Sequence, residues 1–480
     1  MDFQFEQNKK QNLKSRRDFL KKAGLGMSSI LAASAFPVIV PSSVFGKNAP
    51  SNRINIGQIG FGRIAKSHDL PEILKNDIAH VMAVADVDSK RAALGKEWIE
   101  KAYSTKTGKN KYVDVKIYED YHDLLANKDI DAVVISTPDH WHAQPAMEAA
   151  LMGKHIYLQK PTSLTIREGR QMADAVKKSG VVFQLGSQQR SVSPWPQFKR
   201  TCELVRNGRI GKLRKVYVGL PGDPAGGNTA QMPVPSNLNY DFWLGSTPDV
   251  YYTLDRVHSQ TNIDDRPGWL RCEQFGAGMI TGWGSHHIDI AHWGMNTELT
   301  GPIEIEGTAT FPTEGLWNVH GDFKVTARYA NGVIMEIGGD NPNGVKFEGT
   351  AGWIFVSRGN VGVTASDPGA AAASAKNEAF HASDPKILGS VIGKNEIHLY
   401  DSPEQHQNWL ESIREKKQTI SHAEIAHRSC SACLIAHTAM KLGRKLRWDP
   451  KKEEFIRDAE ANATLARPQR GKYGTEKVNL

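Results

Sequence analysis

Continuous apolar runs alternate with amphipathic segments over residues 54–185. Five runs have the length and composition of buried strands, at 54–59, 80–85, 131–136, 155–158 and 181–185. Segments with a helical spacing of apolar positions lie between them, at about 65–74, 88–103, 143–152 and 165–180. Strands that are apolar throughout and alternate with helices form parallel sheets covered on both faces. The pattern predicts an α/β fold that begins with a doubly wound parallel sheet.

The pattern changes after Gly186. Longer segments rich in Thr, Val, Ile and aromatic residues are typical of strands, at 215–219, 303–311, 319–330, 332–338 and 352–357. Helical spacing returns at about 196–207, 403–416 and 422–443. We therefore expect a first domain over 52–185 and a second α/β domain over 186–447 with an open, mostly antiparallel sheet. The polar end, 448–480, is expected to form an extended strap.

Composition and charge narrow the class of protein. Of 480 residues, 40% are hydrophobic and 23% charged, which excludes a wholly disordered chain. The net charge is +8, but removing residues 1–46 leaves 53 basic against 49 acidic residues, or +4. Without a basic stripe interleaved with aromatics, no nucleic-acid partner is expected. Cys202 and Cys272 are isolated, and Cys430 and Cys433 lie in an apolar helical pattern, so all four are expected to be core thiols.

The N-terminal segment has the layout of an export signal. Ser15-Arg16-Arg17-Asp18-Phe19-Leu20-Lys21-Lys22 precedes the apolar, small residues 23–40. Paired arginines before such a run are typical of twin-arginine signals in bacteria. A membrane anchor is the alternative, but glycines, serines and Pro37 would make the run span poorly. We expect residues 1–46 to be a signal peptide of a periplasmic protein that keeps no stable membrane insertion. Because this route carries folded proteins, it favours a tightly bound cofactor.

A dinucleotide-binding fingerprint follows the first strand. Gly60-x-Gly62-x-x-Ala65 stands between a strand and a helix, where it allows a tight turn and close approach of the backbone to a pyrophosphate. Asp86, at the end of the second strand, can bind ribose hydroxyls and repels a 2′-phosphate, so NAD is favoured over NADP. The sequence predicts a Rossmann domain with these cofactor-binding residues: Gly60, Phe61, Gly62, Arg63, Ile64, Asp86, Thr137, Pro138, His142, Gln159 and Gln188.

Three polar clusters follow the later strands, at 136–142, 159–161 and 188–190. Ligands of such sheets bind outside the carboxyl ends of the strands. Lys160 is therefore a candidate proton shuttle for the oxidation of a hydroxyl, since burial and nearby charge can lower the pKa of a lysine toward neutrality. The alternative is a structural lysine in a salt bridge.

A histidine-rich segment over 276–293 is the main chemical feature of the second domain. His286, Asp289 and Trp293 share one face at helical spacing. His286 and His287 point about 100° apart on a helix, so both cannot easily bind one metal, and no metal site is expected. Further substrate-binding candidates are Asp289, Arg190, Tyr251, Arg256, His258, Arg266, Trp269 and His287. Arg and His can bind sugar hydroxyls, and Trp can stack on a sugar ring. The Gly/Pro-rich loop over 220–240 is a candidate lid.

In combination these motifs resemble the glucose–fructose oxidoreductase/inositol dehydrogenase (Gfo/Idh/MocA) family. The resemblance rests on GFGRIA, Asp86, STPDHWH, QKP, GSQQR, WLG, the GxGM…WGxHHxDxxxW segment and the terminal WDP…EAN…R. It implies sugar or polyol substrates, with Lys160 and His286 as the catalytic residues and Asp289 as the acid three residues later. Two positions depart from the family pattern: Gln159 stands for a usual Glu, and Gly282 for an Asp found in many members.

The sequence leaves three functions open. The first is an NAD-dependent oxidoreductase acting on a hydroxyl of a sugar, polyol or glycoside by hydride transfer, with Lys160 as acid/base and His286 assisting. The second is a glycoside-cleaving enzyme that uses bound NAD transiently, with oxidation, elimination and re-reduction and no net redox change. The third is an inactive periplasmic sugar-binding protein, suggested by the two departures. A homo-oligomer, dimer or tetramer, is expected in each case.

Overall fold

The computed structural model describes residues 53–108, 111–359 and 379–479. The expected signal peptide, residues 1–46, lies outside the described residues. Across the described ranges, no helix is both long and apolar enough to cross a membrane.

The first domain is built on the expected parallel sheet. Six strands lie in the order β3-β2-β1-β4-β5-β6 and all pair in parallel. Their bounds are β1 Ile54–Ile59, β2 Ala79–Ala85, β3 Lys116–Tyr118, β4 Ala132–Ile135, β5 His155–Leu158 and β6 Phe183–Leu185. The sequence pattern gave no sign of β3, because this edge strand is three residues long and largely exposed.

Helices cover both faces of this sheet. The helices of the first domain are α2 Leu70–Leu74, α3 Ser89–Thr107, α4 Tyr121–Ala126, α5 Ala143–Leu151 and α6 Ile166–Ser179. Side chains of α2 and α3 share one apolar core, and those of α4, α5 and α6 share another. Helix α6 begins with the expected capping box, in which Thr165 and Glu168 bond to each other's backbone, and ends at Gly180 in the left-handed conformation. Caps of this kind contribute ~1 kcal/mol each.

The helix after β1 contains a π-helical turn over Ala65–Asp69 before it continues as α2. Such turns insert one extra residue per turn and recur at functional sites. Here the turn points His68 into the cleft described below, while Asp69 is fully buried.

The second domain contains a nine-stranded sheet in the order β13-β12-β11-β7-β10-β9-β8-β14-β15. Only β7 and β10 pair in parallel, and the other pairs are antiparallel, as expected. The bounds are β7 Leu213–Gly219, β8 Glu304–Ala309, β9 Phe323–Arg328, β10 Ile334–Gly338, β11 Gly344–Gly349, β12 Trp353–Val356, β13 Phe380–Ala382, β14 Leu446–Asp449 and β15 Glu454–Phe455. Strand β11 was not predicted, although its side chains alternate between buried and half-buried positions.

Helices pack on one face of this sheet and complete its core. They include α7 Pro196–Arg206, α10 Gly284–Met295 and α14 Ala423–Leu442, whose apolar side chains join those of the strands. The shorter helices are α8 Tyr240–Leu244, α9 Met279–Gly282, α12 Pro385–Leu388 and α15 Ala459–Ala463. All four cysteines are buried and unpaired.

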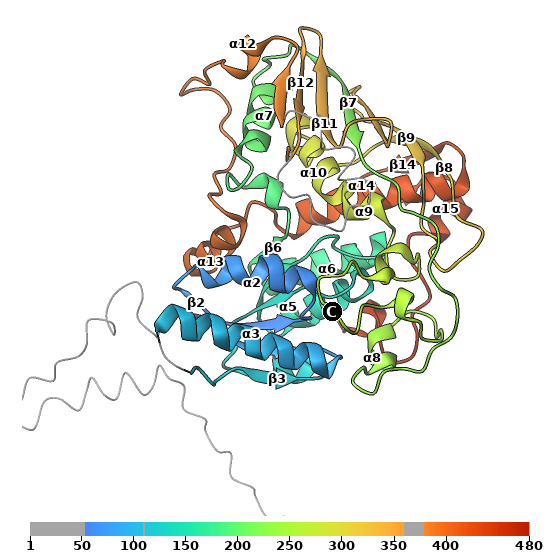
Figure 1. Ribbon diagram of the computed structural model, residues 1–480. Helices are drawn as coiled ribbons and strands as arrows, with labels where there is room; N and C mark the ends of the chain where they lie inside the picture. The colour runs from blue at the N-terminus through green and yellow to red at the C-terminus, as the bar shows by residue number, and fades with distance from the viewer. Residues whose placement is uncertain (1–52, 109–110, 360–378, 480) are drawn as a thin grey trace, which may run out of the picture. The chain divides into compact units, whose positions relative to one another are not determined.

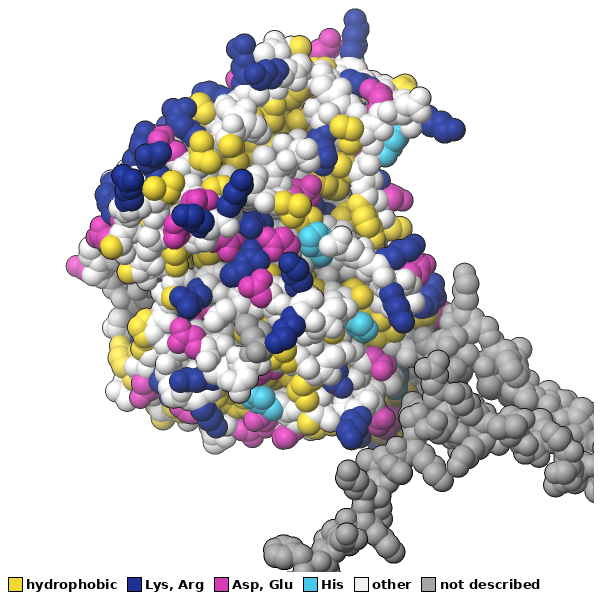
Figure 2. Space-filling view, turned by 180° about the vertical axis from the view of Figure 1, so that it is seen from behind, with side chains coloured by type: hydrophobic (Ala, Val, Ile, Leu, Met, Phe, Trp, Pro, Cys, Tyr) yellow, Lys and Arg dark blue, Asp and Glu magenta, His cyan; other side chains and the backbone are white. Residues whose placement is uncertain are grey.

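The C-terminal part of the chain returns to the first domain. Helix α13 (Gln405–Glu415) packs beside α2, with Trp409 and Leu410 in the same apolar core (Figure 1). Strands β14 and β15 extend the second sheet to Phe455, so the segment expected as a strap from residue 448 begins inside the sheet. On the face shown in Figure 2, Lys and Arg side chains are interspersed with Asp and Glu side chains.

Candidate active site

A cleft runs along the carboxyl ends of the parallel strands and under α9 and α10. It is lined by residues that follow β1, β2, β4, β5 and β6 and by side chains from 263–286 together with Arg358. The predicted site residues that line it are Gly60, Gly62, Arg63, Ile64, Asp86, Thr137, Pro138, His142, Gln159, Lys160, Gln188, His258, Arg266, Trp269 and His286. The structure thus brings the strand-end clusters and the histidine segment to one place.

The glycine turn after β1 has the geometry that a dinucleotide needs. Gly60 has φ +81°, and a Cβ there would lie 3.0 Å from the carbonyl oxygen of Ser136. A Cβ at Gly62 would meet only Nη1 of Arg91, at 3.7 Å, so this stretch of backbone faces open space in the cleft. Helical residues begin at Arg63, so free N–H groups point toward that space, where an anion is favoured. Phe61 does not line the cleft; its side chain is fully buried in the core.

Asp86 fixes the turn from the side of β2. Its Oδ2 accepts a hydrogen bond from Phe61 N at 2.8 Å, and its Oδ1 accepts one from Asp88 N at 2.9 Å. Burial raises the pKa of Asp86, while the nearby Arg91 and the two backbone donors oppose that rise. The carboxylate remains in the lining of the cleft with lone pairs available for hydroxyl groups. The fingerprint and the acidic residue therefore fit a dinucleotide with free ribose hydroxyls.

His258 lies at this end of the cleft, not near Lys160. Its Nε2 lies 3.0 Å from Oδ2 of Asp88, the residue that caps α3. Arg91 of α3 donates to the carbonyl oxygen of Ser259 at 3.3 Å. These contacts join the loop over 250–260 to the first domain, so the substrate-binding role expected for His258 is replaced by a place beside the cofactor residues.

Lys160 follows β5 and points across the cleft to α9. Its Nζ donates to the carbonyl oxygen of Gly282 at 3.1 Å. Burial lowers the pKa of Lys160, and the guanidinium groups of Arg358, Arg63 and Arg266 lower it further against the opposing carboxylate of Asp139. A lysine held in this way can take up and release a proton nearer to neutral pH than an ordinary lysine.

Asp139 supplies a carboxylate that the sequence analysis did not assign. It lies in a short 3₁₀ turn over Asp139–Trp141 and is buried in the cleft wall. Burial raises the pKa of Asp139, and the charge of Lys160 opposes that rise. A Cβ at Gly282 would meet only the sulfur of Met279, at 3.7 Å. Gly282 brings no carboxylate from the second domain, and Asp139, from the same domain as Lys160, places a carboxyl group near it instead.

His286 enters the cleft from the first turn of α10. Burial lowers the pKa of His286 well below its ordinary value, and the positive charges of Arg358 and Lys160 add to this. The imidazole is therefore neutral at physiological pH. Its Nδ1 is buried without a hydrogen-bond partner among the residues that the structure describes. A neutral ring next to Lys160 is suited to hydrogen-bonding a substrate hydroxyl.

Gln159, the residue before Lys160, belongs to a buried hydrogen-bond network. Its Nε2 donates to Oδ1 of Asp69 at 2.7 Å, and Ser136 Oγ donates to Oδ2 of Asp69 at 2.7 Å. His406 of α13 lies on the same carboxylate, with Nε2 3.3 Å from Oδ1, and its Nδ1 is 2.9 Å from Glu404. The structure therefore places a carboxylate next to Gln159 that the sequence pattern did not reveal.

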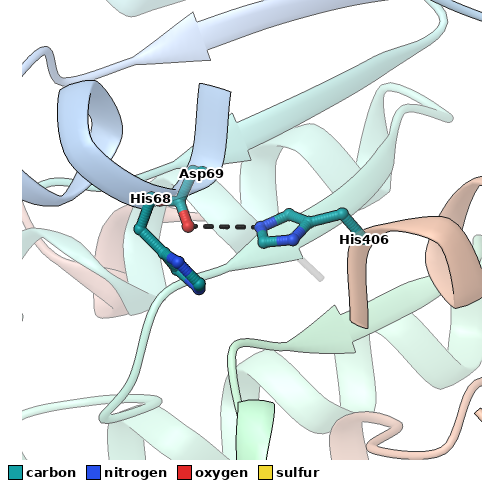
Figure 3. A group of neighbouring side chains, drawn as sticks. All are labelled: His68, Asp69 and His406. Carbon is teal, nitrogen blue, oxygen red and sulfur yellow. Dashed lines mark hydrogen bonds and ion pairs between the residues drawn. The ribbon is translucent and has the colours of Figure 1, made fainter. Parts of the chain in front are cut away.

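His68, Asp69 and His406 lie close enough together to raise the question of a metal (Figure 3). Both oxygens of Asp69 already accept hydrogen bonds, and the dashed line in Figure 3 joins it to His406. Burial alone would lower the pKa of His406, but hydrogen bonds to Asp69 and Glu404 raise it to about 9. Both ring nitrogens of His406 already contact carboxylates, of Asp69 and Glu404, so we interpret the cluster as a hydrogen-bonded network.

Arg190 and Asp289, expected to bind substrate, form a buried ion pair outside the cleft. Arg190 Nε and Nη2 donate to the Asp289 carboxylate at 2.6 and 2.8 Å, and Nη1 donates to Glu298 at 2.6 Å. Ser429 Oγ donates to the same Asp289 at 2.6 Å. Both side chains are about 1–2% exposed. With every strong donor and acceptor satisfied inside the protein, this pair ties α10 to α14 and does not face a ligand.

The remaining predicted residues are spread around the site. Trp269 lines the cleft, but Tyr251 and Arg256 do not. Tyr251 is 41% exposed, and the guanidinium of Arg256 lies 5.1 Å from the centre of its ring. His287 turns away from His286, and its Nε2 lies 2.7 Å from Asn343 Oδ1. The 100° offset between neighbouring helical residues thus separates the two rings, as expected.

Comparison with known families matches both domains. Residues 54–187 match the model described as oxidoreductase family, NAD-binding Rossmann fold (GFO_IDH_MocA). Residues 225–361 and 385–475 match the model described as oxidoreductase family, C-terminal alpha/beta domain (GFO_IDH_MocA_C2).

Individual relatives match over part of their length. A myo-inositol 2-dehydrogenase of Thermotoga maritima is 30% identical over 190 residues, 39% of this chain and 48% of its own. A glycosyl hydrolase family 109 protein of Shewanella baltica is 31% identical over 209 residues, 41% of this chain and 44% of its own. The chain thus spans about half the length of these curated relatives. The solved structure of the WlbA dehydrogenase from Bordetella pertussis with NADH and UDP-GlcNAcA has a TM-score of 0.57 at 16% identity and covers 83% of this chain and 99% of its own.

Proposed function

The chain belongs to the Gfo/Idh/MocA family of NAD-binding oxidoreductases, and from this premise we propose that it oxidises a hydroxyl-bearing carbon of a sugar, polyol or glycoside. The observation that carries the proposal is the meeting of Lys160 and His286 in the cleft that also holds the glycine turn and Asp86. A relative named myo-inositol 2-dehydrogenase supports a polyhydroxylated substrate.

The residues that would hold NAD are those of the glycine turn and the second strand. The N-terminus of the helix that begins at Arg63 would hold the pyrophosphate, and the Asp86 carboxylate would accept hydrogen bonds from the ribose hydroxyls. When bound, NAD accepts a hydride from the substrate carbon. The carboxylate of Asp86 repels a 2′-phosphate, which favours NAD over NADP.

Lys160 moves the proton of the reacting hydroxyl. As the hydride leaves the carbon, the hydroxyl proton passes to the uncharged Nζ, which Gly282 holds in place through its carbonyl oxygen. His286 is neutral, so its ring can hydrogen-bond the same hydroxyl while Lys160 accepts the proton. In the reverse direction, the Lys160 ammonium returns the proton to the carbonyl oxygen as it is reduced.

A second function has a specific observation in its favour, the similarity to a glycosyl hydrolase family 109 protein. In that case the oxidised carbon acidifies the neighbouring C–H, a base removes that proton and the glycosidic oxygen leaves with a proton. Water then adds to the resulting double bond and the carbonyl is reduced again, so the net reaction is hydrolysis. The intact pair of Lys160 and His286 argues against the third possibility, an inactive sugar-binding protein.

One experiment tests the proposal and separates the two reactions. The purified protein is incubated with a panel of sugars, polyols and glycosides, with and without added NAD and an electron acceptor. Net oxidation requires the acceptor, whereas redox-neutral cleavage releases the aglycone without it. Absence of both reactions across the panel, in protein that binds NAD, would contradict the proposal. Denaturing the protein as purified and identifying released nucleotide by mass tests the tight binding we also propose.

Export and assembly are further parts of this proposal. We propose that residues 1–46 direct the folded protein to the periplasm, which cell fractionation with an Arg16→Lys/Arg17→Lys control tests. We also propose a homo-oligomer that pairs the open face of the nine-stranded sheet, where Lys215, Tyr217, Lys346 and Trp353 are half-buried. Light scattering of wild type and Tyr217→Glu measures whether this face forms the oligomer.

No nucleic-acid partner is proposed. The face in Figure 2 shows basic and acidic side chains interspersed.

A further inference from the structure

Three arginines surround Lys160 in one half of the cleft. Arg63, Arg266 and Arg358 line the cleft there and all act on Lys160 through space. Asp139 is the buried carboxyl group that faces Lys160, Asp223 pairs with Arg266, and the exposed Asp265 also lines the cleft. The histidine in this half, His286, is neutral. Among the described residues no carboxylate opposes the effect of burial on Arg358. A buried cation without a counter-ion is costly, so this arrangement favours a site that receives an anion.

Arg358 follows β12 and lines the cleft. Its guanidinium carbon lies 4.2 Å from the ring centre of Trp195 and 4.8 Å from that of Trp283, so it packs against two indole rings. The Gln189 amide, turned with its oxygen toward Arg358, accepts from Nε at 3.0 Å. Nη2 is buried with no hydrogen-bond partner in the described parts of the chain. Burial lowers the pKa of Arg358 to about 9, with no carboxylate to oppose it.

Arg266 is paired through one nitrogen and leaves two without acceptors. Its Nη2 donates to Oδ1 of Asp223 at 2.8 Å, and Asp223 also lies 3.9 Å from Arg271. Its Nε and Nη1 are buried and find no acceptor among the residues that the structure describes. Arg266 and Arg358 therefore both carry buried N–H groups that charge-assisted bonds to a carboxylate, sulfate or phosphate would satisfy.

The cofactor accounts for only one of the three arginines. Arg63 follows Gly62 directly and stands at the start of the helix that would face the pyrophosphate. Arg266 and Arg358 come from the second domain. Arg358 acts on His286 through space, and Arg266 acts on both Arg63 and Lys160. Donors of both arginines thus lie in the part of the cleft that the substrate would share with Lys160.

We propose that the substrate is an acidic sugar, and that Arg358 and Arg266 bind its anionic group, a carboxylate of a uronic acid or a sulfate or phosphate ester. The inference rests on the proposed function, because it takes the cleft to bind a sugar. It adds the charge of that sugar and the residues that select it. The hydroxyl oxygens of a neutral sugar can accept from these donors but leave the guanidinium charge uncompensated, whereas an anion satisfies both with charge-assisted bonds.

Binding to the full-length protein loaded with NADH tests this without turnover. Calorimetry compares methyl hexuronides with the matching neutral methyl hexosides in the gluco, galacto and manno series, and adds the 6-sulfates and 6-phosphates. We expect at least one anionic sugar to bind tenfold or more tightly than its neutral partner. Whether that sugar carries a carboxylate, a sulfate or a phosphate identifies the anion that the site prefers. Equal or tighter binding of the neutral partner in every pair would overturn the inference.

Variants assign the effect to the two arginines. Arg358→Gln and Arg266→Gln should each remove most of the preference for the anion, while Arg358→Lys keeps part of it because the charge stays and the fork is lost. Arg256→Gln is the matched control, since the buried Arg256 also stacks on an aromatic ring, 5.1 Å from that of Tyr251, but does not line the cleft. A preference that survives in both cleft variants, with melting temperatures within a few degrees of wild type, would overturn the assignment.

The outcomes separate this inference from the proposed function. Oxidation or cleavage of a neutral sugar without selective binding of any anion leaves the function standing and refutes the inference. Selective anion binding with no reaction of that sugar upholds the binding site and refutes the oxidoreductase role proposed for it.

Discussion

The side-chain amide of Gln159 donates to the carboxylate of Asp69 at 2.7 Å, directly behind Lys160. A glutamate at position 159, usual in the family, would place two carboxylates in contact in a fully buried position. An amide at 159 is thus compatible with Asp69, which brings a carboxylate to this place from the π-helical turn after β1.

Gln159→Glu should therefore destabilise the protein by about 1–3 kcal/mol at pH 8. Burial and the like charge of Asp69 raise the pKa of such a glutamate in the folded state, so its cost is absent below the unfolded pKa of ~4.3 and grows as the pH rises above it. Urea unfolding at pH 5 and pH 8 measures this. The exposed Gln418→Glu is the control, and Asp69→Asn should restore stability in the Gln159→Glu background. Equal loss at both pH values would refute the explanation.

The pH dependence of oxidation should report Lys160. Because the uncharged amine accepts the proton, kcat/KM should rise with pH and level off below the ~10.4 of an ordinary lysine. Asp139 raises the pKa of Lys160, so Asp139→Asn should move that rise to lower pH. Asp265→Asn, an exposed acid in the same cleft lining, should leave it in place. An unchanged or upward-shifted profile in Asp139→Asn would show that another group controls the rate.

Asp86 should set the choice of cofactor. Removing its carboxylate in Asp86→Ala takes away hydrogen bonds to the ribose and the repulsion of a 2′-phosphate, next to the positive charge of Arg91. We expect NAD binding to weaken by about tenfold or more and NADP binding to improve. Fluorescence titration with NADH and NADPH measures both. A parallel loss for the two nucleotides would mean that Asp86 only supports the turn through Phe61.

Asp289→Asn should act on stability and not on substrate affinity. It leaves the buried Arg190 with only Glu298 as a charged partner and should cost ~3 kcal/mol or more. Asp401→Asn, which breaks the exposed pair with Lys199, should cost less than ~1 kcal/mol. Denaturant unfolding gives both values, and the KM of the folded variant should stay near wild type. A large rise in KM with unchanged stability would restore the substrate-binding role.

The sequence predicted the features that depend on local pattern. The apolar runs and the capping box of Thr165 and Glu168 gave the parallel sheet and its helices, and the glycine fingerprint placed the turn at the end of β1. The sequence did not predict short, exposed strands such as β3, because three residues show too little alternation of apolar and polar positions.

The site was predicted only where one motif contained it. Lys160 and His286 stand in motifs, and the fold brings them together as expected. Arg358 was not found, because its site is made by Trp195 and Trp283 from two other segments and no local pattern records that contact. Asp289 shows the converse. Its spacing to His286 was read correctly, but the buried Arg190 that neutralises it comes from a segment 99 residues earlier in the chain, which no local pattern records.

The most direct test of the account is a single-turnover measurement of absorbance at 340 nm after mixing the NAD-loaded protein with a reactive sugar. Wild type should form NADH in a burst, and Lys160→Met should bind NAD with similar affinity but form NADH at least 100-fold more slowly, since it lacks the group that takes the proton. A burst of wild-type rate and amplitude in Lys160→Met would contradict the assignment of Lys160 as the acid/base of this cleft.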